Sequence, residues 1–431
     1  MKHVTINKLK NYVGQTVKLK GWVYNTRNVG KVWFLILRDG TGLLQCVVVK
    51  GEASGESFKL KNELNQEDAI ILTGSIKKEP RSIGGYELIV TKINLVSSVK
   101  ENYPISHKNH GVDFLMTNRH LWLRSKRQNA IMKIRHIVIK SIRDYFDNNN
   151  FTLIDSPIFT SNAVEGTTTL FEVDYFDRFA YLTQSGQLYQ EAAAMAFGKS
   201  YCFGPTFRAE KSKTRRHLTE FWMVEPEMAY VDLDENMTWA ENLVSFIIKR
   251  VLDSCREELK ILERDIQKLE MIVPPFPRIT YGEAVEIINN CGGKFEYGND
   301  FGAPDETILS EQFNKPIMIH RWPAEIKAFY MKRDEENNDL ALGVDMIATE
   351  GFGEIIGGGQ REDDINLLIE RIKRHNLPLE PFKWYLDLRK FGSVPHSGFG
   401  LGLERTVAWI CGTKHIREVI PFPRTMSRLE P

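Results

Sequence analysis

The sequence lacks the features that mark membrane-spanning, exported and zinc-finger proteins. Its 431 residues contain no run of about 18 apolar residues and no signal-peptide pattern. Only five cysteines are present, and none forms a Cys-x-x-Cys pair, which argues against a zinc knuckle. An odd number of cysteines without an export signal fits a reducing compartment, so we expect a cytoplasmic protein. We expect neither a membrane nor DNA as a partner.

An overall excess of charge is also absent, but the charges are unevenly distributed. The chain carries 57 Lys and Arg against 56 Asp and Glu, for a net charge of +1. Residues 1–110 hold 17 basic against 9 acidic residues, which leaves 40 against 47 in the remainder. A basic N-terminal module on an acidic body indicates a polyanionic partner for that module. A solvated basic surface is the alternative.

The first hundred residues favour a small β-barrel. Five β-rich runs are separated by turn signals such as Asp39-Gly40 and Gly84-Gly85. The predicted strands are residues 17–24, 32–37, 43–49, 69–76 and 87–96. Five short strands with little helix are typical of the OB-fold, which binds nucleic acid. Another small barrel without a ligand is the alternative. We therefore predict a first domain over residues 1–100.

Residues 101–118 are polar and are predicted to form a linker to a second domain over residues 119–431. A helix is predicted from Gln128 to about residues 148–150. Its apolar face comprises Ile131, Ile134, Val138, Ile142 and Tyr145. A strand is expected over residues 152–155, before Pro157, and a helical section over residues 238–269. The charged, helical composition near residues 250–310 predicts an insertion that forms a solvent-facing subdomain.

A cationic loop forms the first candidate site. Residues 201–207 and 221–230 are predicted strands, and residues 211–219 between them are rich in Lys and Arg. The first strand ends in the sequence Phe207-Arg208-Ala209-Glu210, which leads into the loop. Arginine makes bidentate, permanently charged hydrogen bonds to phosphate. The loop is therefore suited to a polyphosphate, with His217 near its end and Phe221 stacked on a base. A solvated hairpin tip is the alternative.

Residues 397–405, Ser-Gly-Phe-Gly-Leu-Gly-Leu-Glu-Arg, form the second candidate. Gly398, Gly400 and Gly402 permit close approach of the backbone to a ligand. Arg405 directly after them suits phosphate. The segment is neither a P-loop nor a dinucleotide fingerprint, because the required Gly-Lys-Ser/Thr and Gly-x-Gly-x-x-Gly patterns are missing.

Two acidic residues form the third candidate. Asp345 and Glu354 precede a triple glycine over residues 357–359. Two carboxylates near a nucleotide usually hold Mg²⁺, which neutralises phosphate charge. An unrelated acidic strand edge is the alternative.

A fourth candidate spans residues 184–189, where neutral amide and hydroxyl groups suit a small zwitterion. Ser185 and Gln187 are the candidate ligands, although Ser185 is also a possible N-cap for a helix over residues 188–196. The sequence shows no nucleophile–base pair, no GxSxG elbow and no HExxH site. The chemistry is therefore expected to rest on positioning and electrostatics, as in attack on a phosphoryl group.

The Pro157 region, the Phe-Arg-Ala-Glu loop and the Gly-Leu-Gly-Leu-Glu-Arg segment resemble, in order and spacing, the three motifs of class II aminoacyl-tRNA synthetases. The N-terminal barrel resembles that of the aspartyl, asparaginyl and lysyl subgroup, and bacterial asparaginyl-tRNA synthetases are the most similar family. The resemblance covers nearly the whole chain and is weakest near residues 250–310. It implies an α+β fold class, with an OB-fold barrel for the anticodon of tRNA(Asn) and an antiparallel sheet flanked by helices. It also implies a homodimer, formed through the helix from Gln128 and the strand to Pro157.

The resemblance implies two steps: ATP-dependent formation of asparaginyl-adenylate, then transfer of the asparaginyl group to tRNA. Arg208 would bind the α-phosphate and polarise the amino-acid carboxylate, and Arg405 would hold the γ-phosphate beside Gly402. Glu210 and His217 would contact ATP, and Phe221 would stack on adenine. Asp345 and Glu354 would bind Mg²⁺.

For the amino acid, the resemblance implies that Gln187, Ser185 and the mobile loop of Glu165 hold the α-amino end of L-asparagine. Arg361 would donate to the side-chain carbonyl, and Glu225 would accept from its amide nitrogen. An aspartate would place a second carboxylate against Glu225 in a closed site, which is costly.

Further features separate the chain from the aspartyl enzymes, which carry a lysine where this chain has Gln190 and a proline where it has Gly186. Thr425 also matches the asparaginyl pattern, and the chain has no room for the large inserted domain of bacterial aspartyl enzymes.

In the barrel, Phe34 and Gln45 match positions that read the central anticodon base, with Arg27 supporting the backbone. A core position for Phe34 is the alternative.

Three other functions stay open from the sequence. They are an aspartyl-tRNA synthetase of relaxed tRNA specificity, a paralogue that amidates aspartate, and a non-catalytic RNA-binding paralogue.

Overall fold

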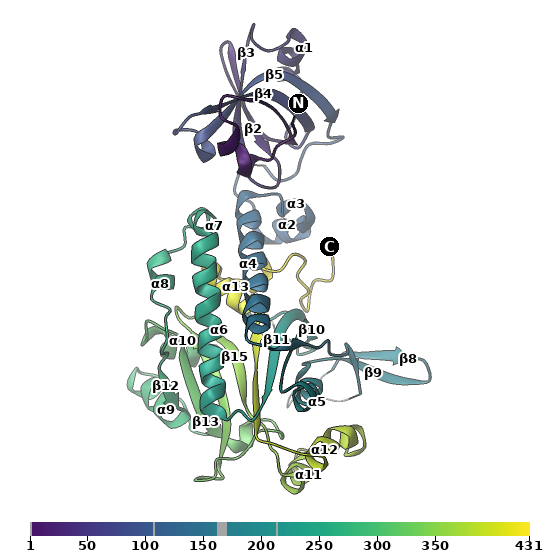
Figure 1. Cartoon of the computed structure of the whole chain (residues 1–431), viewed down its shortest axis with the longest axis vertical. Coiled ribbons are helices and arrows are strands. Elements are labelled where there is room, and N and C mark those ends of the chain that lie inside the picture. Colours follow the sequence, from purple (N-terminus) through teal and green to yellow (C-terminus); the bar gives the residue numbers. More distant parts are fainter. Residues whose placement is uncertain (1, 107, 162–169, 213) are drawn as a thin grey trace. The chain divides into compact units, whose positions relative to one another are not determined.

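The computed structural model describes residues 2–106, 108–161, 170–212 and 214–431 (Figure 1). The chain divides into two compact units, Met1–Arg124 and Ser125–Pro431. Within the described residues, no helix is both long enough and apolar enough to span a membrane. All five cysteines are free thiols, and Cys291 is the exposed one among them.

The N-terminal unit is a closed five-stranded barrel in the order β1-β2-β3-β5-β4. Its strands are β1 (Thr16–Val29), β2 (Val32–Arg38), β3 (Leu43–Val49), β4 (Ala69–Lys78) and β5 (Tyr86–Ser97). Each of the five predicted runs lies within one of these strands, so the predicted strands are confirmed. Neighbouring strands are antiparallel except for β3 and β5, which are parallel. A short helix, α1 (Gly55–Lys59), lies between β3 and β4.

Alternation along β2 explains how the barrel fills its interior. Trp33, Leu35 and Leu37 are fully buried, whereas the residues between them are half-buried. Successive side chains of a strand point to opposite faces, so one face of β2 forms the core and the other forms the outer wall. Phe34 lies on the outer wall and is therefore not a core residue.

The predicted linker is not wholly irregular. It contains α2 (Val112–Thr117), and α3 (Arg119–Trp122) follows it. Met116 in α2 is buried, with a relative exposure of 1%. Burial of this apolar side chain stabilises the segment, which its polar composition had masked.

The C-terminal unit is built on an eight-stranded sheet in the order β12-β13-β14-β15-β16-β11-β10-β6. Its strands are β6 (Thr152–Leu153), β10 (Lys199–Phe207), β11 (Glu220–Ala229), β12 (Arg278–Thr280), β13 (Ile317–Pro323), β14 (Leu340–Ala348), β15 (Gly353–Gln360) and β16 (His396–Gly402). The sheet is antiparallel apart from the pairs β6–β10 and β12–β13 at its edges. A separate three-stranded sheet contains β7 (Phe159–Thr160), β8 (Glu172–Tyr175) and β9 (Arg178–Leu182).

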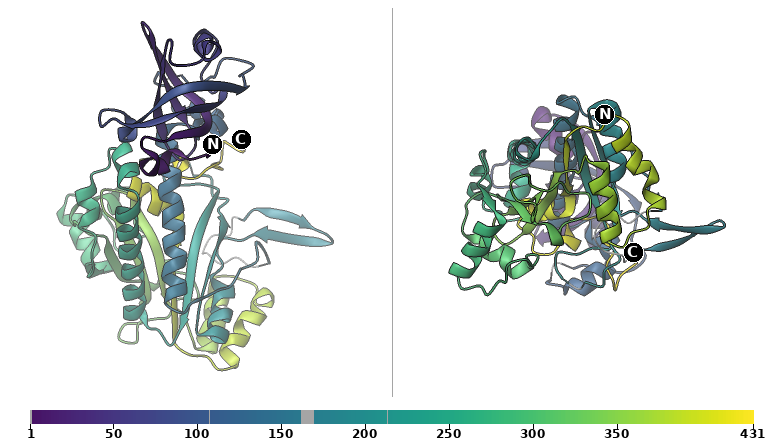
Figure 2. Two further views of the ribbon diagram at one scale, coloured as in Figure 1. Left: turned by 45° about the horizontal axis from the view of Figure 1, so that its top comes forward. Right: turned by 90° about the horizontal axis from the view of Figure 1, so that it is seen from below.

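Two long helices, α4 (Lys126–Asn148) and α6 (Leu233–Ser254), lie side by side against the large sheet (Figures 1 and 2). The predicted apolar face of α4 is buried, which confirms the 3-4-4-3 spacing. The helix begins two residues before the predicted start, because the Ser125 hydroxyl accepts a hydrogen bond from the Gln128 amide and caps it. The remaining helices are α5 (Gln187–Phe197), α7 (Arg256–Ile261), α8 (Ile266–Glu270), α9 (Tyr281–Asn290), α10 (Ala303–Glu311), α11 (Ile365–Arg374), α12 (Lys383–Lys390) and α13 (Leu403–Cys411).

The segment near residues 250–310 was expected to form a solvent-facing subdomain, but part of it is buried in the core of the C-terminal unit. Leu259 and Leu269 join the main core, and Tyr281 is fully buried in a second cluster against β13. Strand β12 also belongs to the segment and extends the large sheet. The charged residues that dominate its composition concealed these widely spaced apolar contacts.

A buried ion pair joins α4 to the end of the sheet. Arg135 of α4 lies 2.7 Å from Glu404 at the start of α13, and both side chains are almost fully buried. Arg135 also donates to the Val419 carbonyl, and Glu404 accepts from the Trp222 amide of β11. Three segments far apart in sequence are therefore held by one carboxylate and one guanidinium.

We expect Arg135→Leu to reduce the free energy of unfolding by about 3–5 kcal/mol, because it leaves the Glu404 carboxylate buried without its cation. Lys140→Ala, in an exposed pair with Asp144 on the same helix, is the matched control. The control should change the free energy by less than about 0.5 kcal/mol. Urea unfolding of both variants measures the difference, and similar values for the two would contradict the prediction.

Candidate active site

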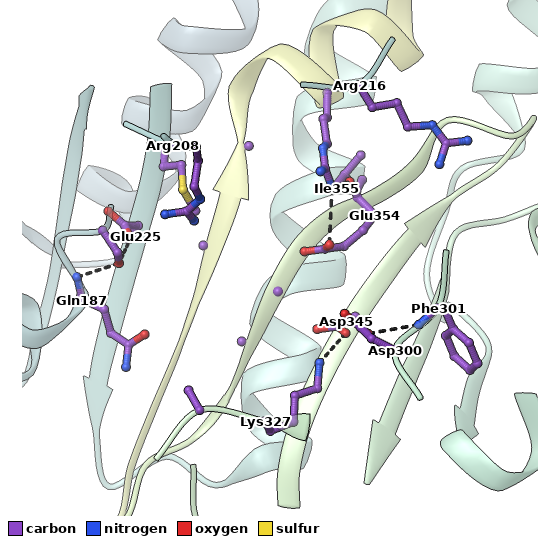
Figure 3. A pocket seen from close by; sticks show the side chains of 18 of the residues that line it. Gln187, Arg208, Arg216, Glu225, Asp300, Phe301, Lys327, Asp345, Glu354 and Ile355 are labelled. Atoms are coloured by element: carbon purple, nitrogen blue, oxygen red, sulfur yellow. Dashed lines mark hydrogen bonds and ion pairs between the residues drawn. The ribbon is translucent and has the colours of Figure 1, made fainter. Parts of the chain in front are cut away.

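A cavity of about 610 Å³ opens on the face of the large sheet opposite the main core. On β11 the Val224 side chain joins the core, whereas Met223 and Glu225 line the cavity. The alternation of strand side chains thus separates a structural face from a chemical face. The cavity brings together twelve residues predicted from the sequence: Ser185, Gln187, Arg208, Glu210, His217, Phe221, Glu225, Asp345, Glu354, Arg361, Gly402 and Arg405 (Figure 3).

Arg208 and Phe221 lie at the open end of the antiparallel pair formed by β10 and β11. The strands pair Phe207 with Glu220, so Arg208 directly follows the end of the ladder. Its Nη1 atom donates to the Gln184 carbonyl oxygen at 2.7 Å. Its guanidinium carbon lies 5.7 Å from the centre of the Phe221 ring. The pair presents a fixed positive charge beside an aromatic face, which suits a phosphate and a base.

The loop after Arg208 carries His217 and Arg216. Burial lowers the pKa of His217, and Arg405 lowers it further. His217 therefore offers a neutral hydrogen-bonding ring at pH 7. Arg216 donates to Glu306 of α10 at 2.5 Å and also to the Gly351 carbonyl, which ties the loop to the segment after β14.

Arg405 extends from the first turn of α13, and Gly402 is the N-cap residue of that helix. The Arg405 Nη1 atom donates to the backbone carbonyl of Glu354 at 2.8 Å and lies 3.3 Å from its carboxylate. Of the three glycines predicted to approach a ligand, Gly400 and Gly402 line the cavity. Gly398 has a different role, since a side chain there would overlap the Glu227 carboxylate on β11.

Asp345 and Glu354 lie on neighbouring strands and face one small space. A Cβ atom at Gly357 would lie 2.9 Å from Glu354 Oε1 and 3.5 Å from Asp345 Oδ1. Burial raises the pKa of Asp345 to about 7, with a further increase from Glu354 and an opposing effect from Lys327. Lys327 Nζ donates to Asp345 Oδ2 at 2.7 Å (Figure 3).

The Asp345 and Glu354 carboxylates converge, and Lys327 compensates only part of their negative charge. Such a pair of oxygen ligands fits a divalent cation. No group of three or more His, Cys, Asp or Glu suited to a metal occurs in the part of the chain that the structure describes. Asp345 and Glu354 are the two carboxylates that could hold Mg²⁺, whose coordination is usually completed by phosphate and water.

Glu225 and Arg361 lie near Ser185 and Gln187 at the other end of the cavity. Glu225 accepts hydrogen bonds from the Ser185 hydroxyl and from the Gly186 amide, the latter at 2.8 Å. Ser185 is therefore not the N-cap of α5, which is Gly186, although its Oγ also accepts from the Gln187 amide at 3.1 Å.

Arg361 is almost fully buried and pairs with Glu227, with Nη2 lying 2.5 Å from Oε1. Its Nη1 atom lies 3.8 Å from Met331 Sδ. Burial raises the pKa of Glu227 to about 7, although Arg361 opposes this increase. Glu227 was not identified from the sequence, because nothing in its local pattern distinguishes it from Glu225.

Gln190 does not line the cavity. It is fully buried, and its Nε2 atom donates to the Ile154 carbonyl at 2.8 Å and to Ser156 at 3.0 Å. A Cβ atom at Gly186 would lie 2.7 Å from Ser156 Oγ and 2.6 Å from Cys202 Sγ. These two positions therefore shape the wall behind Ser185 and do not themselves face a ligand. Glu165 lies outside the described residues.

In the barrel, Arg27, Phe34 and Gln45 share the outer face of three adjacent strands. Arg27 pairs with Phe34 across β1 and β2, and Phe34 pairs with Val47 across β2 and β3. Gln45 lies two positions before Val47 on β3 and therefore on the same face. Its Nε2 atom donates to Glu87 at 2.7 Å. An exposed cation, a half-buried ring and an oriented amide on one face suit an unpaired base.

Comparisons with known proteins match this architecture. The family of class II tRNA synthetases for D, K and N matches residues 111–426, and the OB-fold nucleic acid binding domain matches residues 17–96. The chain is 60% identical to an asparagine–tRNA ligase of Desulforamulus reducens over 100% of both chains.

The chain belongs to the asparaginyl-tRNA synthetase family.

Solved structures agree with membership of the asparaginyl-tRNA synthetases. The asparaginyl-tRNA synthetase of Pyrococcus horikoshii, complexed with asparaginyl-adenylate, has a TM-score of 0.96 and 43% identity over 99% of both chains. An aspartyl-tRNA synthetase of Entamoeba histolytica has a TM-score of 0.85 and 28% identity over 100% of this chain and 93% of that one. Aspartyl enzymes thus share the fold, and the α+β fold class with an OB-fold barrel is confirmed.

The sequence did not predict every charged residue of the cavity in this family member. Arg216 belongs to the predicted cationic loop, but Asp300, Glu306 and Lys327 were missed. Glu306 and Asp300 come from the segment near residues 250–310, where no site residue was predicted. Lys327 follows β13 and gave no local signal. Their roles depend on contacts between segments up to about a hundred residues apart, which no periodicity reveals.

The raised pKa values of the cavity carboxylates predict that the stability of the native state depends on pH. Burial raises the pKa of Glu306 to about 7, and Glu354 adds to the increase, whereas Arg405 and Arg216 oppose it. The proton that Glu306 retains stabilises the native state fully below pH 4.5, and this contribution is lost as the pH rises through about 7. Asp345 and Glu227 act in the same direction.

We expect Glu306→Gln to flatten the decrease in stability between pH 4.5 and pH 7, because the amide cannot lose a proton in this range. Urea unfolding at several pH values measures this change. The exposed Glu335→Gln is the control and should follow the unmodified chain. Parallel curves for all three proteins would show that Glu306 carries no raised pKa.

Proposed function

We propose that this chain activates L-asparagine with ATP and transfers the asparaginyl group to tRNA(Asn). In the first step, a carboxylate oxygen of asparagine attacks the α-phosphorus of ATP. A phosphorus–oxygen bond forms, the bond to the bridging oxygen breaks, and pyrophosphate leaves. In the second step, a hydroxyl of the terminal adenosine of the tRNA takes the asparaginyl group, and AMP leaves.

One observation supports the proposal: a single cavity is lined by Arg208, Arg405 and the carboxylates Asp345 and Glu354, and also by the pair Glu225 and Arg361. The first group suits a triphosphate with Mg²⁺, and the pair suits a side-chain amide. In Figure 3, Gln187 and Glu225 lie at one end and Asp345 and Glu354 at the other, with Arg208 nearer the first. A carboxylate bound beside Glu225 and a triphosphate running toward Asp345 would therefore meet near Arg208. The chain is also similar to the P. horikoshii enzyme solved with asparaginyl-adenylate.

The proposed ATP site uses Arg208 and Arg405 as its catalytic cations. Arg208 would bind the α-phosphate, where negative charge develops during the attack, and polarise the reacting carboxylate. Arg405 would hold the γ-phosphate beside Gly402. The neutral His217 ring and Glu210 would contact ATP, and Phe221 would stack on adenine against the Arg208 guanidinium.

Asp345 and Glu354 would hold Mg²⁺, which supplies positive charge to the phosphates when bound. Lys327 keeps one Asp345 oxygen engaged and partly compensates its charge. The two carboxylates thus remain oriented toward the space over Gly357.

The selection of asparagine follows from how Glu225 and Arg361 are already engaged. The Ser185 hydroxyl, the Gly186 amide and the Cys202 thiol donate to Glu225. An ionised carboxylate can only accept, so Glu225 would accept from an amide NH₂ of the substrate as well. Glu227 holds two of the nitrogens of Arg361, which leaves Nη1 to donate to the side-chain carbonyl of asparagine. An aspartate carboxylate would bring like charge to Glu225 without a donor to offer. Gln187, Ser185 and Glu165 would hold the α-amino end.

The remaining parts of the proposal concern tRNA and assembly. Residues 1–100 would bind the anticodon through Arg27, Phe34 and Gln45, and residues 119–431 would carry the chemistry. The homodimer would form along α4 and the strand to Pro157, where Leu153, Ile158 and Phe159 leave apolar surface exposed. Unpaired cysteines suit a cytoplasmic location.

Pyrophosphate exchange into ATP, without tRNA, tests the first step. We expect exchange with asparagine and none with aspartate. Arg208→Ala should lower kcat about 100- to 1000-fold, because it removes a preorganised donor from the developing charge. Arg256→Ala, in an exposed ion pair on α7, is the control and should have no effect. Exchange with aspartate would overturn the selectivity argument and leave the ATP site intact.

Aminoacylation of tRNA tests the barrel separately. We expect Phe34→Ala to lower kcat/KM for tRNA(Asn) about 5- to 100-fold, the equivalent of one lost base–aromatic stack. Pyrophosphate exchange by the same variant should be unchanged, because Phe34 belongs to the N-terminal unit. An unchanged kcat/KM for tRNA would exclude Phe34 from anticodon binding.

A further inference from the structure

A cluster of buried charges lies behind the amino-acid end of the cavity. Glu191 of α5 is fully buried and accepts hydrogen bonds from three side chains. The donors are Gln187 Nε2 at 3.1 Å, the Tyr385 hydroxyl at 2.8 Å and Arg389 Nη2 at 2.7 Å, and the His396 Nε2 atom lies 3.0 Å from the same carboxylate. None of Glu191, Tyr385, Arg389 and His396 lines the cavity, and neither the class II motifs nor the proposed chemistry assigns them a role.

The charge state of the cluster follows from its hydrogen bonds. The His396 Nδ1 atom lies 2.8 Å from the Val394 carbonyl oxygen, which can only accept. Its Nε2 atom faces Glu191, so both ring nitrogens meet acceptors if the carboxylate is ionised. Burial alone would raise the pKa of Glu191, but Arg389 and His396 hold it well below its ordinary range. Glu191 is therefore an anion whose strongest partners are on α12 and β16.

The cluster reaches the cavity through Gln187. Its side chain extends from α5 into the cavity (Figure 3) and is one turn before Glu191 on the same helix. An ionised Glu191 can only accept, so it fixes which atom of the Gln187 amide is turned inward. The NH₂ group faces Glu191, and the carbonyl oxygen is left for the ligand. An oxygen is the atom that an α-ammonium group requires.

We propose that Glu191 is a positioning residue for amino-acid activation, which orients the Gln187 amide so that its oxygen accepts from the α-ammonium group of the substrate. Arg389 and His396 hold the Glu191 carboxylate in place, and the Arg389 Nε atom is itself fixed by the Glu362 carbonyl at 2.9 Å. Glu191 thus favours a substrate with a protonated α-amino group, although it does not contact the substrate itself. This inference rests on the proposed function, because it concerns the same amino-acid site.

Glu191→Gln tests the proposal. The new amide would turn its oxygen toward Arg389, since a hydrogen bond to the charged guanidinium is the stronger one. Its NH₂ group would then face Gln187, whose amide would have to reverse and present NH₂ to the substrate ammonium. We expect the KM for asparagine in pyrophosphate exchange to rise about 10- to 100-fold, as for a lost hydrogen bond to a charged group. The KM for ATP should stay within about twofold, because the ATP contacts are untouched.

A double-mutant cycle separates positioning from a general structural effect. Gln187→Ala should itself raise the KM for asparagine, and adding Glu191→Gln to it should raise the KM no further, since the second residue acts through the first. Tyr385→Phe is the matched control. It removes a buried donor from the same carboxylate and leaves the Gln187 contact in place, so its KM for asparagine should be unchanged.

Several outcomes would overturn the proposal. They are an unchanged KM for asparagine in Glu191→Gln, multiplicative effects in the double variant, or an equal rise in the KM for ATP. If Glu191→Gln does not fold, Glu191→Asp keeps the charge but is too short to reach both Gln187 and Arg389, and it should show the same selective rise. Failure of both variants to fold would assign Glu191 a structural role instead.

The same experiment distinguishes this inference from the proposed function. If the unmodified chain does not exchange pyrophosphate with asparagine, the proposed function fails. If it does, and Gln187→Ala raises the KM whereas Glu191→Gln does not, only the positioning role of Glu191 fails.

Discussion

The antiparallel pairing of β11 with β16 is the constraint on which the catalytic unit depends. It sets Glu227 opposite Gly398 and Met223 opposite Gly402, although these pairs are about 170 residues apart in sequence. Gly398 is required because the Glu227 carboxylate fills the space of its side chain. Because side chains alternate, this register directs Val224 and Leu401 into the core and Glu225 and Gly400 toward the cavity. A shift of one residue would exchange the two faces.

Charge compensation is the second organising feature. Arg361 pairs with Glu227, Arg389 with Glu191, and Lys327 with Asp345, and all six side chains are mostly or fully buried. Such pairs contribute little net stability, since desolvation offsets their attraction. Their value here is geometric, because each pair fixes a group that would otherwise rotate. Asp345, whose pKa burial raises to about 7, lies where the proposed Mg²⁺ would bring positive charge.

Much of the fold could be predicted from local patterns. The five barrel strands and the buried face of α4 follow from periodicities of about two and 3.6 residues, which depend on neighbours within one element. The segment near residues 250–310 could not be predicted in the same way. Its core contacts are made by isolated residues such as Leu259 and Leu269, and its charged surface dominates the composition. The packing partner, and not the local pattern, decides which side of such a segment is buried.

For the site, the sequence by itself determined which chemical groups are available: Arg208, Phe221, Arg405 and the two acidic residues stand in recognisable segments. Only the tertiary structure decided what they contact. It placed Gln190 outside the cavity, gave Gly398 a packing role, brought Lys327 and Glu306 to the cavity, and set the Glu191 cluster behind it. The physical reason is that residue type fixes charge and hydrogen-bonding capacity, whereas burial, partner and orientation arise from strands paired across more than a hundred residues.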